Sequence, residues 1–176
     1  MALCVLIFSL CACGEKGSEN AAIYGETVGE LEDNELFAII DTNASLPVLL
    51  VTSQVYNDGL GNQAALNCDV YYLIDKEVKN IGTIESMGTA YPIAYDETGI
   101  YAASGHDMQR FEIEKSGSLR LAEGIYEQFD ESGNAAYTMK KGEETDVFFK
   151  SCIVFFFCNY ICFLSFFHGI SSISTF

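Results

Sequence analysis

A serine, a histidine and an aspartate in the second half of the chain are residue types that a hydrolase uses. Ser86 begins the segment Ser-Met-Gly-Thr, and His106 and Asp107 follow a Ser-Gly pair. A serine becomes a nucleophile when a histidine accepts its proton and a third group orients that histidine. These residues give one hypothesis, an extracytoplasmic hydrolase that uses Ser86 and His106.

Two features of the same residues argue against catalysis. The domain lacks the Gly-x-Ser-x-Gly turn that exposes a nucleophilic serine in many hydrolases. Adjacent side chains on an extended strand point to opposite faces, so His106 and Asp107 would diverge. The small residues beside His106 instead predict a tight turn, with the imidazole bonded to backbone. We therefore predict no catalytic residue and keep the hydrolase as the alternative function.

The seven cysteines divide by their place in the chain. Three lie near the start and three near the end, and only Cys68 lies between them. Its segment alternates as a strand does, which predicts a buried free thiol. A reactive thiolate needs a neighbouring cation or histidine, whereas Asp69 follows here.

The net charge of the chain and the absence of several sequence motifs argue against several functions. The chain has 25 acidic and 9 basic residues and a formal net charge of -16. Such a surface repels phosphate backbones, so we expect no nucleic-acid partner. Residues 22–146 contain no Walker loop, no dinucleotide G-x-G-x-x-G after a strand, no C-x-x-C pair and no H-E-x-x-H. We interpret the many acidic residues as a means of keeping the protein soluble. The alternative interpretation is that they attract cations or basic surfaces.

The chain begins with an apolar run that turns abruptly polar. Ala2 to Leu10 is uncharged and is too short to span a bilayer as a helix, but it fits the apolar region of a secretory signal. Leu10, Ala12 and Cys13 resemble the lipobox of bacterial lipoproteins. That resemblance implies cleavage before Cys13, diacylation of its thiol, and attachment to the outer face of the cell membrane, where two acyl chains hold a protein firmly.

These signals predict four segments. Residues 1–12 are a signal peptide, 13–21 a polar tether, 22–146 a β-rich domain, and 147–176 an apolar tail. The alternatives for the start are an ordinary cleaved signal or a buried strand of a cytosolic domain.

The tail has an unusual composition. It has no charge after Lys150 and contains no Ala, Asp or Glu. A transmembrane helix over 152–167 would be short against the roughly 20 residues required, and a membrane-lying or aggregation-prone segment is a second interpretation. We favour a third, a thymine-rich gene read in the wrong frame or past its end. The domain is then expected to fold without the tail.

Between these ends the pattern predicts a β-rich α+β domain, with a short N-terminal helix packed on an antiparallel strand meander. In the helix, expected over 22–32, Tyr24, Val28 and Leu31 share one face. Two apolar runs, 35–40 and 47–52, suit strands buried on both faces. Turn residues separate the strands, which are expected at 35–40, 47–52, 69–74, 78–84, 100–104, 108–114, 119–123 and 136–140.

This order of elements, with the segments Phe37 to Asp41, Pro47 to Val51 and Ile81 to Ile84, resembles an uncharacterised β-rich domain of surface lipoproteins from Gram-positive bacteria. The resemblance covers most of residues 22–144. It implies no activity. In many members the first loop is similar to the calcium-binding D-x-D-x-D-G loops of integrin-type propeller repeats.

That loop gives one candidate metal site. Calcium takes six to eight oxygen ligands, and Asp41, Asn43 and Ser45 keep the alternate spacing that supplies them. Only one of the three is charged, and Leu46 stands where the turn-making glycine belongs. A degenerate loop is the better interpretation, in which these side chains bond their own backbone without a metal. Calcium is thus the only cofactor that the sequence suggests.

Seven aromatic side chains could line a carbohydrate or peptide groove, because tyrosine combines a stacking face with a hydroxyl. At alternating strand positions they more often form core or cross-strand pairs. They are Tyr71, Tyr72, Tyr91, Tyr95, Tyr101, Phe111 and Tyr126. The function expected from the sequence is a lipid-anchored, non-enzymatic surface domain that binds or supports an unidentified extracellular ligand or protein.

Overall fold

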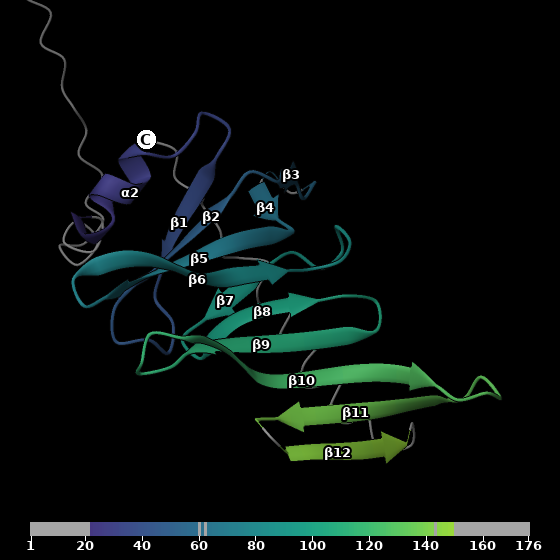
Figure 1. Ribbon diagram of the computed structural model, residues 1–176. Helices are drawn as coiled ribbons and strands as arrows, with labels where there is room; N and C mark the ends of the chain where they lie inside the picture. The colour runs from purple at the N-terminus through teal and green to yellow at the C-terminus, as the bar shows by residue number, and fades with distance from the viewer. Residues whose placement is uncertain (1–21, 60, 62, 143, 150–176) are drawn as a thin grey trace, which may run out of the picture.

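The computed structural model describes residues 22–59, 61, 63–142 and 144–149. These residues form mainly β-strands, together with one short α-helix, α2 (Gly25–Gly29) (Figure 1). Every strand pairing among them is antiparallel. The expectation of a β-rich, antiparallel chain with little helix is confirmed.

The first half of the domain forms a four-stranded sheet. Its strand order is β1-β2-β5-β6, so the connection from β2 to its neighbour β5 leaves the sheet. That connection contains a small hairpin whose two strands, β3 (Val55–Asn57) and β4 (Gln63–Ala65), pair only with each other. The strands of the sheet are β1 (Leu36–Ile40), β2 (Val48–Thr52), β5 (Asn67–Ile74) and β6 (Glu77–Glu85).

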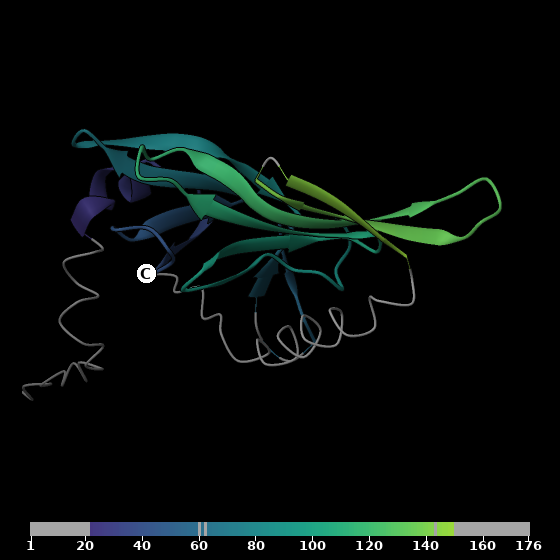
Figure 2. The same cartoon turned by 90° about the horizontal axis from the view of Figure 1, so that it is seen from below.

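The second half forms a six-stranded sheet in which each strand pairs with its neighbour in the chain. Figure 2 shows the hairpin of β10 and β11 extending beyond the rest of the domain. The strands are β7 (Ala94–Asp96), β8 (Gly99–Ala103), β9 (Asp107–Ile113), β10 (Leu119–Phe129), β11 (Ala135–Lys141) and β12 (Glu144–Phe149).

The main core joins the two sheets. Alternate side chains of β2 and β5 pack with side chains of β8 and with Ile113 at the end of β9. Burying each such aliphatic side chain contributes about 1.5–3 kcal/mol, so this cluster is the chief stabilising contact between the sheets. Its buried members are Ile40, Val48, Leu50, Cys68, Val70, Tyr72, Ile84, Ile100, Ala102 and Ile113.

A second cluster forms on the other face of β2. Leu49 and Val51 pack with Tyr24, and Val28 and Leu31 lie against the same group. The Tyr24 hydroxyl donates a hydrogen bond of 2.6 Å to the backbone oxygen of Pro47, just before β2. β2 is therefore buried on both faces, as its unbroken apolar run predicts. β1 is only partly buried, because it lies at the edge of its sheet.

The sequence predicted each long strand but several boundaries were wrong. α2 ends at Gly29 rather than residue 32, because two glycines weaken the helix. β10 continues to Phe129, six residues past the expected end, because its pairing with β9 and β11 runs through Gly124, where the apolar alternation breaks. The strands β3, β4, β7 and β12 were not expected, and β12 runs past Asp146, the expected end of the domain.

Candidate functional site

Several candidate features lie outside the described residues. The lipobox with Cys13 and the tail from residue 150 onward are among them. In the part of the chain that the structure describes, no helix is both long and apolar enough to cross a membrane.

The candidate calcium loop joins β1 to β2, and two of its three side chains bond to other strands. The amide of Asn43 donates to the Ile113 oxygen at 3.0 Å and accepts from the Ile113 nitrogen at 3.2 Å. It thereby pairs with the end of β9 as a neighbouring strand would. The Ser45 hydroxyl lies 3.2 Å from the Tyr72 hydroxyl, which also accepts a bond from the Leu46 nitrogen.

These contacts change the sequence interpretation of the loop. Asn43 and Ser45 bond to distant partners, not to their own backbone as expected; only Thr42 makes a local bond, accepting from the Ala44 nitrogen. Asp41 is exposed. Burial raises the pKa of Tyr95, and the nearby Asp41 charge raises it further. The described residues contain no cluster of three His, Cys, Asp or Glu side chains suited to a metal ion.

Ser86 follows β6 and holds neighbouring strands together. Its hydroxyl accepts a 3.0 Å bond from the Ala103 nitrogen, and its own nitrogen donates to the Leu66 oxygen at 2.7 Å. Only 8% of the residue is exposed. A hydroxyl in this position satisfies a backbone amide of β8 instead of facing a substrate.

His106 lies in the tight turn between β8 and β9, as its small neighbours predict. The Ser104 hydroxyl accepts from the His106 and Asp107 nitrogens and closes that turn. The imidazole, however, bonds to a carboxylate and not to backbone: its Nδ1 lies 2.8 Å from Glu127 Oε2. Tyr137 donates to the other oxygen of that carboxylate at 2.7 Å.

Glu127 is thus the residue that sequence reasoning missed. It lies 21 positions after His106, on β10, and only the pairing of β9 with β10 brings it close. The His106 ring also meets the Phe129 ring edge to face at 5.8 Å. An imidazole held by a carboxylate supplies two of the three members of a catalytic triad, but among the described residues no hydrogen bond joins this imidazole to the Ser86 hydroxyl, which accepts from the Ala103 nitrogen. The Asp107 charge lies near Tyr126, whose pKa is raised first by burial and then by that charge.

Cys68 is a buried free thiol, as predicted. It is 3% exposed on β5 within the main core. Burial, and then the charge of Asp69, raise its pKa to about 12. A thiol with this pKa stays protonated at neutral pH and is a poor nucleophile.

The aromatic side chains do not gather in one groove. Tyr72 and Tyr101 are buried, while Tyr71 packs in the second cluster on the opposite face of its sheet. Tyr126 lies under the Lys140 ammonium, 5.2 Å from its ring centre. Tyr91, by contrast, is exposed, in the linker between the two sheets.

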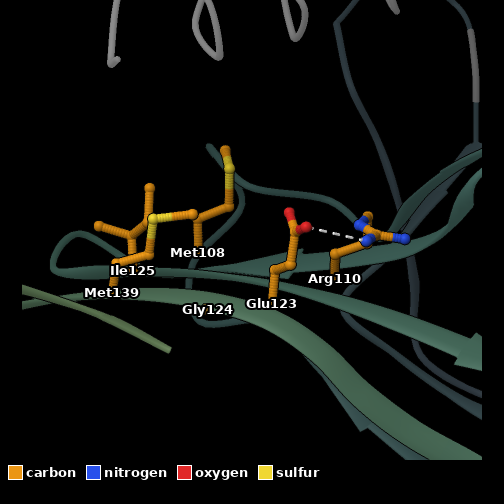
Figure 3. A pocket seen from close by; sticks show the side chains of 6 residues that line it. All are labelled: Met108, Arg110, Glu123, Gly124, Ile125 and Met139. Carbon is orange, nitrogen blue, oxygen red and sulfur yellow. Dashed lines mark ion pairs between the residues drawn. The ribbon is translucent and has the colours of Figure 1, made fainter. Parts of the chain in front are cut away.

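A shallow hollow on the six-stranded sheet was also not foreseen. Met108, Ile125 and Met139 stand in a row across β9, β10 and β11, because Ile125 is paired with both methionines (Figure 3). The next row holds Arg110 and Glu123, whose ion pair measures 3.2 Å. The strand register alone assembles this surface, so no local motif could have predicted it.

Comparison of the chain with protein-family models, with curated proteins and with solved structures finds no match. What the protein does is therefore inferred from its own residues and their geometry.

Proposed function

We propose that the chain is a lipid-anchored surface domain that binds or supports a partner outside the cell membrane, without catalysis. Cys13 would carry the diacyl anchor, and the domain would lie on the extracytoplasmic face. The fold class that we assign with this function is β-rich α+β, with the N-terminal helix packed on the sheet.

One observation carries the non-enzymatic part of this proposal. Among the described residues no hydrogen bond joins the Ser86 hydroxyl to the His106 imidazole. Ser86 is 8% exposed and accepts from Ala103, whereas the His106 side chain is 67% exposed and pairs with Glu127. Proton transfer requires the nucleophile and base within about 2.6–3.2 Å. Each side chain instead ties strands together, which supports a structural role for both.

Mass spectrometry of the protein recovered from bacterial membranes tests the anchor. We expect a mature chain that begins at a diacylated Cys13. Replacement of Cys13 by Ala should abolish acylation and release the domain from the membrane fraction. An unprocessed chain that begins at Met1 would contradict the anchor.

The alternative function is a surface hydrolase, and the His106–Glu127 contact is the observation that favours it. A hydrolase panel on the wild type, His106→Ala and Ser86→Ala variants separates the two functions. We expect no turnover above background in any of the three. Turnover in the wild type that both substitutions abolish would establish the hydrolase.

A further inference from the structure

We propose that the linker between the two sheets and the β3–β4 hairpin form one docking surface, which binds a cationic polypeptide through an apolar anchor. This inference rests on the proposed binding function and names its surface and partner class. The surface consists of Tyr56, Met87 and Tyr91, with Asp58 and Glu85 as its charged neighbours, and is called the linker surface below.

The linker surface exposes two large apolar side chains on one short segment. Met87 is 74% exposed and Tyr91 is 37% exposed. Among the described residues only Phe129, on the far hairpin, is also a large exposed hydrophobic side chain. Residues 87–92 form an exposed run, so the apolar groups are gathered on one short segment. Methionine and tyrosine are both enriched in the buried centres of protein interfaces.

The backbone beneath these side chains is fixed. The nitrogens of Ser86 and Ile93, at the two ends of the linker, donate to backbone oxygens of Leu66 and Ala65 at 2.7 and 2.9 Å. The Met87 nitrogen donates to β8 at 2.9 Å. A partner would therefore bind a preformed backbone, and little additional ordering would oppose association.

Tyr56 joins the hairpin to the linker. Its hydroxyl donates a 2.7 Å hydrogen bond to the backbone oxygen of Thr89. Asn67 pairs with Glu85, so the strand that follows the hairpin begins where the linker begins (Figure 1). Two segments separated in sequence thus contribute to one surface.

The charge around the linker surface indicates the kind of partner. The sequence contains no Lys or Arg from 51 to 75 or from 80 to 109, and these two stretches supply the hairpin and the linker. Asp58 and Glu85 are exposed there, and the Asp58 charge, together with the larger effect of burial, raises the pKa of Tyr56. A cationic polypeptide is attracted to such a surface, whereas nucleic acid and anionic lipid are repelled. An apolar side chain on that polypeptide would contact Met87 and the two tyrosines.

Binding of a labelled synthetic peptide of alternating Lys and Leu to the full chain tests this inference by fluorescence anisotropy. We expect Met87→Ser with Tyr91→Ser to weaken binding at least about tenfold, as loss of a central interface contact does. Phe129→Ser removes an equally apolar exposed side chain elsewhere and should leave the affinity unchanged. Asp58→Asn with Glu85→Gln should slow association and reduce its dependence on salt. Circular dichroism verifies that each variant is folded.

Equal affinities for the wild type and the Met87 and Tyr91 variant would overturn the linker surface. Loss of binding only in Phe129→Ser would also overturn it, while leaving a binding domain in place. If sedimentation shows a dimer that Met87→Ser dissociates, the partner of the linker surface is a second copy of the chain and not a cationic polypeptide. Lipidation of Cys13 is read separately by mass spectrometry, so failure of the anchor is distinguishable from failure of this surface.

Discussion

Cys68 and Tyr24 each hold a proton more firmly in the folded chain than in the unfolded one. Both are buried, and burial raises the pKa of each to about 12; the Asp69 charge adds to the shift at Cys68, and Tyr72 adds to that at Tyr24. The ordinary pKa values are 9.0 for the thiol and 10.0 for the phenol. The unfolded chain therefore releases these protons first as the pH rises.

Stability should consequently fall in alkaline solution. The contribution of Cys68 is complete below pH 9 and is lost as the pH rises to about 12. For each proton that the folded chain retains and the unfolded chain has lost, the free energy of unfolding falls by a further amount of about 1.4 kcal/mol per pH unit. We expect Cys68→Val to make the slope shallower by about that amount, measured by urea unfolding between pH 9 and 11, with Tyr24 intact in both proteins. Parallel slopes would contradict the burial effect.

The first loop makes a second prediction at the residue scale. A calcium ion that recruited Asn43 and Ser45 would have to replace their bonds to Ile113 and Tyr72. We therefore expect no measurable heat when millimolar calcium, the range of weak extracellular sites, is titrated into the full chain. A heat that disappears in Asp41→Ala would show that the loop binds calcium after all.

At the scale of elements, two turns from different sheets meet at one end of the core. The β9–β10 turn contains Gly117, whose φ of +87° favours glycine. A Cβ added there would lie 2.6 Å from Ile74 Cγ1, at the end of β5. A Cβ added at Gly82 on β6 would lie 3.1 Å from Leu119 Cδ2. These glycines let the sheets approach.

Gly117→Ala should therefore destabilise the domain for two reasons, backbone strain of about 1 kcal/mol and crowding of about 1–3 kcal/mol. Gly133 is a matched control, because its φ is +79° but a Cβ there would meet nothing within 4 Å. We expect a loss of about 2–4 kcal/mol in the free energy of unfolding for Gly117→Ala and about 1 kcal/mol for Gly133→Ala, measured by urea denaturation. Equal losses would exclude a close contact between the turns.

Over the whole molecule, the stabilising clusters lie far from β12. They draw on α2, β1, β2 and β5 to β10, whereas β12 is the outermost strand of the six-stranded sheet. Figure 1 shows β10–β12 on the side of that sheet away from β1 and β2. Removal of the chain end should therefore leave the core intact.

Truncation tests that division. Deletion after Asp146 removes three residues that pair with β11, and deletion after Phe149 retains all of β12. We expect both shortened chains to be soluble and to unfold in one cooperative transition. The midpoint of that transition should be at most slightly below that of the full chain. Loss of the cooperative transition in the Asp146 truncation alone would make β12 part of the essential core; loss in both would assign that role to the tail.

The sequence by itself determined the local features of this protein. Alternating apolar residues and turn residues predicted the antiparallel strands, because strand periodicity and turn chemistry act over a few neighbours. The same alternation placed Cys68 inside. Strands of three residues, such as β7, are too short to show a period, and Gly124 concealed the second half of β10.

Only the tertiary structure decided which side chains meet. Asn43 bonds to Ile113, 70 residues away, and His106 bonds to Glu127 rather than to its neighbours. The contact of His106 with Glu127 depends on the register of β9 and β10, which a bulge between Leu121 and Glu123 shifts by one residue. A one-residue shift moves side chains to the opposite face, so no local pattern could predict the partner of His106.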